Sequence, residues 1–107
     1  MYKLYGMVAG GTIVPVPEAD RYVDVDAMLA AITPRTGLVF VANPGNPTGT
    51  KISDADIARL IAGTPPEVVI VLDGAYADYI ENLDGGASFV ETHDNVVMLR
   101  TLSKMYG

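Results

Sequence analysis

Four short apolar segments rich in β-branched residues recur along the chain, separated by stretches with helical spacing. They are residues 12–16, 37–42, 67–72 and 95–100. Strands that alternate with helices are typical of an α/β protein with a parallel sheet. Residues 68–72 are apolar at every position, as expected when helices cover both faces of a sheet. We therefore expect an α/β fold of three layers, αβα, with a mostly parallel central sheet.

The stretches between these segments carry signals for the beginnings and ends of helices. Asp24 can cap a helix whose apolar residues follow at i, i+3, i+4 and i+7, and Pro34 ends it. Ser53 followed by Asp56 resembles a capping box, and Gly63 fits the C-terminal cap of a second helix. These two helices are expected to pack on the sheet through their apolar stripes.

Composition narrows the class of protein. The 107 residues carry a net charge of -6 without a basic cluster, which argues against binding to nucleic acid or to an acidic membrane surface. The chain has no cysteine, and its single histidine, His93, cannot build an imidazole-rich metal site, so we expect no metal centre. The longest apolar stretches are far below the ~20 residues that span a bilayer, and no apolar leader opens the chain. We expect a cytoplasmic protein with small-molecule partners.

The third helix is expected within residues 86–92. No repeat, low-complexity tract or linker interrupts the alternation of strands and helices. Residues 1–107 are therefore expected to form one continuous α/β unit.

Polar residues follow three of the four expected strands directly. They form residues 43–49 (Asn-Pro-Gly-Asn-Pro-Thr-Gly), 73–76 (Asp-Gly-Ala-Tyr) and 101–104 (Thr-Leu-Ser-Lys). Ligands of open α/β sheets bind beyond the carboxyl ends of the strands, so these residues are the candidates for a site. Each segment alone has an ordinary explanation as a turn, a loop carboxylate, a packing tyrosine or a solvated lysine. Only their joint order and spacing point to a function.

That order and spacing resemble the cofactor site of fold type I pyridoxal-phosphate enzymes. Residues 43–49 match the N-P-x-N-P-T-G motif of these enzymes, residues 73–76 match D-x-A-Y, and residues 100–107 match R-T-x-S-K-x-Y-G. Residues 2–17 and 23–41 are also similar to the corresponding parts of histidinol-phosphate aminotransferases. The resemblance implies the central part of the large domain of the aspartate aminotransferase fold, with pyridoxal 5'-phosphate as cofactor.

The resemblance implies roles for four residues in the chemistry. Lys104 matches the lysine that joins the cofactor aldehyde as an internal aldimine and then moves protons at the substrate α-carbon. Asp73 matches the carboxylate that keeps the pyridine nitrogen protonated. Asn46 and Tyr76 match the residues that donate hydrogen bonds to the phenolic oxygen of the cofactor. Lys104, Asp73 and Tyr76 are thus the expected catalytic residues.

Three further residues are implied as cofactor ligands. Thr101 matches the phosphate-binding hydroxyl of the family, and Ser103 is a second candidate for the same group. Tyr2 matches the aromatic residue that stacks on the pyridine ring, and it can equally be a frayed terminal residue.

The resemblance implies a ping-pong aminotransferase, with histidinol phosphate and 2-oxoglutarate as expected substrates in histidine biosynthesis and with active sites at a dimer interface. The chain has no counterpart of the upstream glycine-rich phosphate loop, of the arginine after the lysine or of the small domain, so alone it is expected to be inactive. Aromatic aminotransferases, threonine-phosphate decarboxylases and carbon-sulfur lyases share these motifs and stay as alternatives. A non-catalytic cofactor-sensing module and an inert structured fragment are alternatives from other classes.

The family's sheet has a strand between those matching residues 12–16 and 37–42, and this chain has no counterpart of it. A vacant slot of this kind would leave backbone groups unpaired. We therefore expect the isolated chain to self-associate or to close its sheet with a different strand order.

Overall fold

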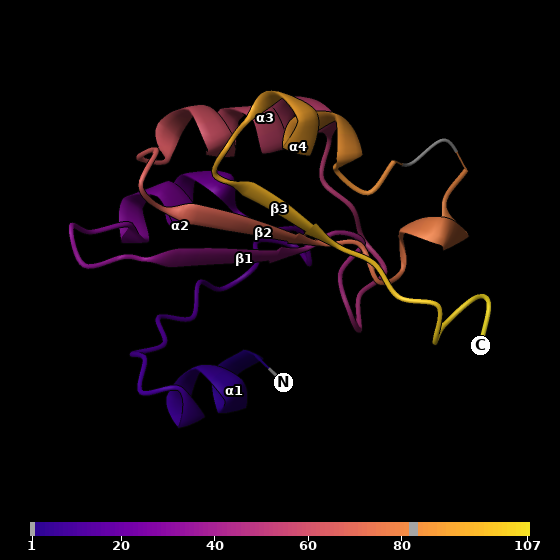
Figure 1. Ribbon diagram of the computed structural model, residues 1–107, viewed down its shortest axis with the longest axis horizontal. Helices are drawn as coiled ribbons and strands as arrows, with labels where there is room; N and C mark the ends of the chain where they lie inside the picture. Colours follow the sequence, from indigo (N-terminus) through magenta and orange to yellow (C-terminus); the bar gives the residue numbers. More distant parts are fainter. Residues whose placement is uncertain (1, 82–83) are drawn as a thin grey trace.

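The computed structural model describes residues 2–81 and 84–107, and its centre is a parallel sheet in the order β1-β2-β3 (Figure 1). The strands are β1 (Leu38–Ala42), β2 (Val69–Asp73) and β3 (Val96–Leu99). These strands confirm three of the four expected segments and the parallel α/β class. The consecutive residues Ile70, Val71 and Leu72 of the central strand are all buried, as its continuous apolar sequence predicts.

Three helices pack on one face of this sheet: α2 (Val25–Ala31), α3 (Asp54–Gly63) and α4 (Ala87–Thr92). Their apolar residues form one core with the sheet residues of that face, in which Leu60 and Ile70 are fully buried. A short 3-10 helix, η1 (Ala77–Tyr79), follows β2. All three expected helices are present.

The caps of these helices agree with the sequence at their beginnings. The Asp24 carboxylate accepts a hydrogen bond from the Ala27 amide at 3.0 Å, and the Ser53 hydroxyl accepts one from the Asp56 amide at 3.1 Å. The Gly63 prediction was wrong, because Gly63 is the last helical residue and the next residue is the cap.

A different requirement explains the glycine at the end of α3. A Cβ atom on Gly63 would lie only 2.7 Å from Cδ2 of Leu29, so glycine lets α2 approach α3 closely. The cap itself is Thr64, whose hydroxyl donates to the Leu60 carbonyl at 2.6 Å. This buried threonine closes the helix end without a left-handed residue.

The expected strand at residues 12–16 was wrong. These residues lie in the irregular segment between α1 (Tyr2–Val8) and α2, where Val14 is 65% exposed. Pro15 and Pro17 lack the N–H groups that a strand inside a sheet must donate, which gives a physical reason. The vacant slot expected between two strands therefore does not arise in the part of the chain that the structure describes.

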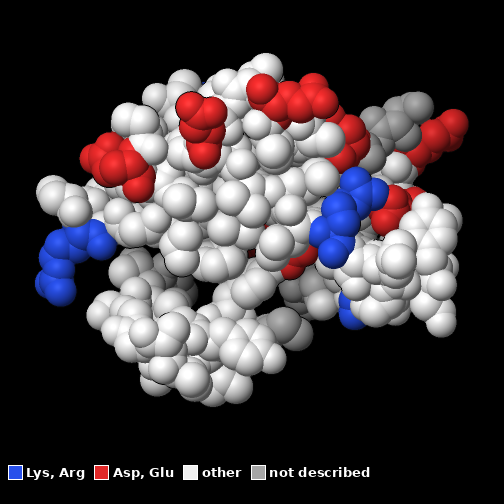
Figure 2. Space-filling model, in the orientation of Figure 1, with Lys and Arg blue, Asp and Glu red and all other residues white. Residues whose placement is uncertain are grey.

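The helix α1 lies on the side of the sheet opposite to α2, α3 and α4 (Figure 1). It buries none of its residues, and this face of the sheet stays partly bare, with Phe40 42% exposed and Leu99 42% exposed. Figure 2 shows acidic side chains over the three-helix layer and an uncharged surface around α1 in the same view. No helix among residues 2–81 and 84–107 is long and apolar enough to cross a membrane.

Candidate active site

The carboxyl ends of the three strands lie side by side. Ala42 pairs with Asp73, and Asp73 pairs with Leu99. The alignment continues for one residue, because the Asn43 amide donates to the Asp73 carbonyl at 3.0 Å and the Gly74 amide donates to the Leu99 carbonyl at 2.9 Å. The three polar segments found in the sequence therefore leave the sheet at one edge, as expected.

Asn43 anchors the first of these segments to the body of the domain. The residue is only 7% exposed, and its Oδ1 accepts a hydrogen bond from the Ile52 amide at 3.0 Å. The Gly45 amide donates to the Thr50 carbonyl at 2.8 Å, which closes the loop upon itself. Sequence reasoning assigned no role to Asn43. The available signal was a polar residue placed directly after a buried strand.

The structure brings Asn46 and Tyr76 together from neighbouring segments. The Asn46 Nδ2 atom donates a hydrogen bond to the Tyr76 hydroxyl at 3.3 Å. Both residues border an open cavity of about 270 Å³. It is lined by Pro44, Gly45, Asn46, Pro47, Gly49, Tyr76, Tyr79 and Ile80. Two residues predicted to contact one ligand atom thus share a cavity and a hydrogen bond.

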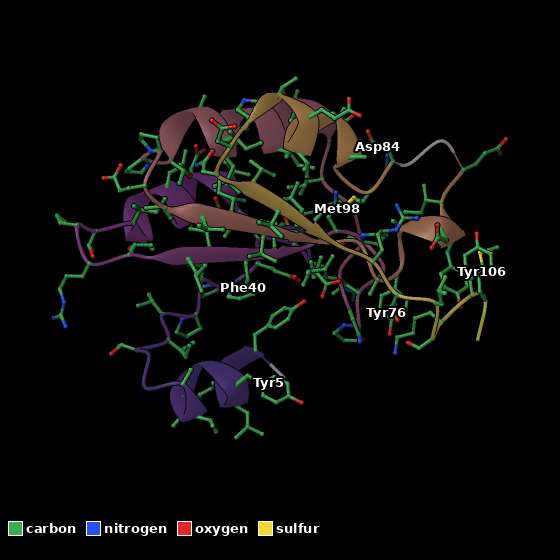
Figure 3. The ribbon with its side chains drawn as sticks, in the orientation of Figure 1. Tyr5, Phe40, Tyr76, Asp84, Met98 and Tyr106 are labelled. Carbon is green, nitrogen blue, oxygen red and sulfur yellow. The ribbon has the colours of Figure 1, made fainter. Side chains whose placement is uncertain are left out.

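Lys104 reaches the same place from the third segment. Its Nζ atom lies 5.6 Å from the centre of the Tyr76 ring, within the range of a cation–π contact. Tyr76 itself lies beyond the carboxyl ends of the strands, away from α1 (Figure 3). The amine, the phenol and the Asn46 amide therefore gather at one end of the sheet.

Asp73 is the last residue of the central strand and is half-buried. Its Oδ1 accepts a hydrogen bond from the Ala75 amide at 3.0 Å, which turns the chain toward Tyr76. The carboxylate therefore stands at the strand end with a defined orientation.

The hydroxyls of Thr101 and Ser103 lie 2.8 Å apart, and the Ser103 amide donates to the Thr101 hydroxyl at 3.1 Å. Thr101 also lines a second open cavity of about 290 Å³, together with Asp78, Arg100, Leu102 and Tyr106. The two hydroxyls thus form one local donor group at the start of the lysine segment.

Tyr2 is placed differently from the other predicted residues. Its ring stacks on Phe40 of β1, with the ring centres 4.9 Å apart and the planes inclined by 24°. Phe40 lies on the α1 side of the sheet (Figure 3). Tyr2 does not line either of the two cavities at the carboxyl edge.

An ion pair between Arg100 and Asp78 joins the lysine segment to η1. Arg100 also donates from Nη1 to the Asp84 carbonyl at 3.2 Å. The hydrogen bond from the Gly86 amide, and next those from Ser88, lower the pKa of the Asp84 carboxyl below its ordinary value of 3.8. None of these charged groups was singled out from the sequence, in which Arg100 was only a letter of a motif.

The sequence model of the family "Aminotransferase class I and II" matches residues 1–107. The chain belongs to this aminotransferase family. Curated relatives include histidinol-phosphate aminotransferases from Ruegeria pomeroyi, 58% identical, and from Dinoroseobacter shibae, 55% identical, each over all 107 residues. The identities extend over the whole chain, so the family membership does not rest on the three motifs alone.

Solved aminotransferase structures agree with the fold. Histidinol-phosphate aminotransferase from Sinorhizobium meliloti, in complex with pyridoxal-5'-phosphate, matches 99% of this chain with a TM-score of 0.82 and 29% identity. N-Succinyldiaminopimelate aminotransferase from Mycobacterium tuberculosis matches 97% of the chain with a TM-score of 0.69 and 26% identity. This chain covers 29% of each of those chains, and 30% of the length of the curated aminotransferases named above.

Proposed function

We propose that the chain is the central part of the cofactor-binding large domain of a pyridoxal-phosphate-dependent aminotransferase. One observation carries the proposal: Lys104, Tyr76 and Asn46 come from three different segments and gather at the carboxyl edge of the sheet. Asp73 ends the central strand at the same edge. An amine, a carboxylate, a phenol, an amide and two hydroxyls form a set of polar groups that suits pyridoxal phosphate.

The proposed reaction transfers the amino group of histidinol phosphate to 2-oxoglutarate, in histidine biosynthesis. Its support is the 58% and 55% identity to histidinol-phosphate aminotransferases over the whole chain. The S. meliloti enzyme of the same name, whose structure contains pyridoxal-5'-phosphate, supports the cofactor. We place the enzyme in the cytoplasm. We also propose a homo-oligomer, because Leu38 and Phe40 are exposed on the face of the sheet that carries α1 (Figure 1) and can contact a partner there.

The residues divide the work according to their chemistry. When bound, pyridoxal phosphate supplies an aldehyde for covalent attachment and a ring that withdraws electrons from the substrate α-carbon. The Lys104 amine would hold the cofactor through that aldehyde, and the same amine would move a proton at the substrate α-carbon. The Asp73 carboxylate holds a proton on the ring nitrogen, because an anion beside the nitrogen favours its charged form.

The remaining residues bind and orient. Asn46 and Tyr76 donate hydrogen bonds to the phenolic oxygen, and the hydrogen bond between them holds the two donors together. The adjacent hydroxyls of Thr101 and Ser103 donate hydrogen bonds to the phosphate. Stacking by Tyr2 on the ring stays a prediction, and it requires the Tyr2 side chain to exchange Phe40 for the cofactor.

The cofactor part of the proposal is tested by covalent labelling. The chain is incubated with pyridoxal 5'-phosphate, reduced with borohydride, digested and mapped by mass spectrometry. The pyridoxyl group is expected on Lys104, while Lys3 and Lys51 serve as internal controls because they are the other two lysines of the chain. Labelling that is no greater at Lys104 than at Lys3 and Lys51 contradicts the proposal.

The substrate part is tested on the longer enzyme that contains this chain. Glutamate formation from 2-oxoglutarate is expected with histidinol phosphate as amino donor. An aromatic amino acid as the preferred donor, carbon dioxide released from threonine phosphate, or sulfide released from a thioether or thiol amino acid would each assign a different reaction to the same site.

A further inference from the structure

Arg100 follows the last residue of β3 and contacts two separate points of the segment after Tyr76. Its Nη2 atom pairs with the Asp78 carboxylate, and its Nη1 atom donates to the Asp84 carbonyl at 3.2 Å. An arginine fork can bond to two acceptors at once, and each bond to a charged partner is stronger than a neutral one. A single side chain therefore connects the exit of β3 to η1 and to the beginning of α4.

The Arg100 ion pair is more sheltered than a comparable pair elsewhere in the chain. The side chains of Arg100 and Asp78 are 33% and 18% exposed, whereas those of Arg59 and Asp26, which link α3 to α2, are 47% and 83% exposed. Exposed pairs contribute little because water and salt screen them, so the Arg100 pair is the more effective constraint of the two.

Two glycines make room for the arginine. A Cβ atom on Gly74 would lie 3.2 Å from Cδ of Arg100, and one on Gly85 would lie 2.8 Å from its Nη1. Gly74 lies between Asp73 and the turn that leads to Tyr76, so the arm of the arginine packs directly under the second polar segment. The side chain is built into the fold and does not extend freely into solvent.

Through these contacts Arg100 connects the segment after Tyr76 to the segment that carries Lys104. Asp78 belongs to η1, which begins directly after Tyr76, and Lys104 lies four residues after Arg100. We infer that Arg100 is a positioning residue that holds the Tyr76 phenol beside the Asn46 amide and under the Lys104 amine. The importance of this position for the reaction rests on the proposed function, but the placement of the side chains can be measured without any cofactor.

The inference is tested with four variants of the chain. Arg100→Met removes the guanidinium and keeps an apolar arm, and Asp78→Asn removes the charge of its partner. Arg59→Met is the matched control, because it breaks an ion pair between α2 and α3 that lies outside the site. Arg100→Lys keeps the charge, but a compact ammonium group cannot replace the two-pronged contact, so only partial rescue is expected.

The first measurement is independent of pyridoxal phosphate. In nuclear magnetic resonance spectra, the Asn46 side-chain amide is expected to show a nuclear Overhauser contact to the Tyr76 ring in the unchanged chain. Arg100→Met and Asp78→Asn should lose this contact and keep the contacts of the core, whereas Arg59→Met should keep both. If Arg100→Met does not fold, Asp78→Asn decides the question by the same contact.

The second measurement uses pyridoxal 5'-phosphate and borohydride as the probe. The ratio of labelling at Lys104 to labelling at Lys51 should fall about tenfold in Arg100→Met, because small displacements of a reacting group lower its rate by up to roughly a hundredfold. Folded Arg100→Met and Asp78→Asn variants with the Asn46–Tyr76 contact and the labelling ratio unchanged would overturn the inference. An equal loss in Arg59→Met would also overturn it, since that would indicate a general effect of stability. Labelling that avoids Lys104 in the unchanged chain contradicts the proposed function alone, and the first measurement then still decides the role of Arg100.

Discussion

The side-chain amide of Asn46 donates a hydrogen bond to the hydroxyl of Tyr76 at 3.3 Å, across 30 positions of sequence. The bond connects the loop after β1 to the turn after β2, and the Lys104 amine approaches the same tyrosine from the segment after β3. Tyr76 is thus the meeting point of all three polar segments. Substitutions of Tyr76 can therefore test the chemistry of the site with little effect on the stability of the fold.

Replacing Tyr76 by phenylalanine removes the hydroxyl and keeps the ring under Lys104. The free energy of unfolding is expected to change by about 1 kcal/mol or less, because the lost hydrogen bond to Asn46 is exposed. In the proposed longer enzyme, kcat/KM for amino transfer is expected to fall about tenfold or more, since the proposed donor to the cofactor would be lost. Tyr79→Phe is the control, because Tyr79 lines the same cavity and has no assigned role. Equal losses in the two variants would contradict the role of Tyr76.

In the proposed longer enzyme, Asp73→Asn is expected to lower turnover far more than it lowers cofactor affinity. The amide oxygen can still accept the hydrogen bond from the Ala75 amide, so the turn after β2 is preserved. An uncharged amide cannot hold a proton on the ring nitrogen, and preorganised electrostatic groups contribute on the order of 3 kcal/mol to the transition state. The measurements are kcat for amino transfer and the dissociation constant of pyridoxal phosphate. Near-normal turnover by Asp73→Asn would remove this residue from the mechanism.

The sequence predicts those parts of the fold whose signals are local and continuous. The unbroken apolar run of β2 and the caps Asp24 and Ser53 correspond directly to buried strand residues and to hydrogen bonds at helix ends. Residues 12–16 are also apolar and β-branched, but they form no strand, because a strand depends on a partner that a local pattern does not contain. Gly63 was assigned to a C-terminal cap because the local pattern does not contain the neighbour that requires a glycine there. Its contact with Leu29 comes from another helix.

Residues of the candidate site could be predicted from the sequence where they belong to a known motif. They could not be predicted where their role depends on contacts between distant parts of the chain. Asn46, Tyr76 and Lys104 were predicted from motif letters, and the structure brings them together. The ion pair of Arg100 with Asp78 joins residues 22 positions apart, and neither residue type is unusual at the surface. Only the packed structure shows that this pair connects two segments of the site.

The lowered pKa of the Asp84 carboxyl predicts that the stability of the fold depends on pH. Its pKa is lowered in the folded chain, chiefly by the Gly86 amide, so the folded state binds the proton more weakly than the unfolded state does. This stabilising contribution is complete above the ordinary pKa of 3.8 and is lost as the pH falls through the lower pKa of the folded chain. Asp84→Asn should therefore lower the free energy of unfolding at neutral pH by roughly 0.5 kcal/mol or less, because water screens this exposed carboxylate, and the difference from the unchanged chain should shrink as the pH falls below 3.8.

Denaturant unfolding at a series of pH values between about 7 and 3 measures this difference. Glu67→Gln is the control, because Glu67 is exposed and lies outside the helices and strands. A difference between Asp84→Asn and the unchanged chain that stays constant across the series would show that the Asp84 carboxylate does not stabilise the fold through its charge.

The bare face of the sheet predicts that the isolated chain self-associates. Leu38 is 55% exposed, and Phe40, Val97 and Leu99 are each 42% exposed, although all four belong to strands. Exposed apolar residues on one face of a sheet favour association, and β1 has no strand on its outer side among the described residues, which leaves backbone groups available for pairing. The apparent mass from light scattering is therefore expected to rise with protein concentration.

A charge on the bare face should prevent this association. Leu38→Lys introduces one into the edge strand β1, where a lysine blocks pairing with a second chain. Val90→Lys is the matched control, because Val90 is 40% exposed but belongs to α4 in the opposite layer. The apparent mass should become that of a monomer in Leu38→Lys and should still rise with concentration in Val90→Lys. An unchanged chain that remains a monodisperse monomer over the whole concentration range would contradict the prediction, since the exposed strand residues would then be stable in water without a partner.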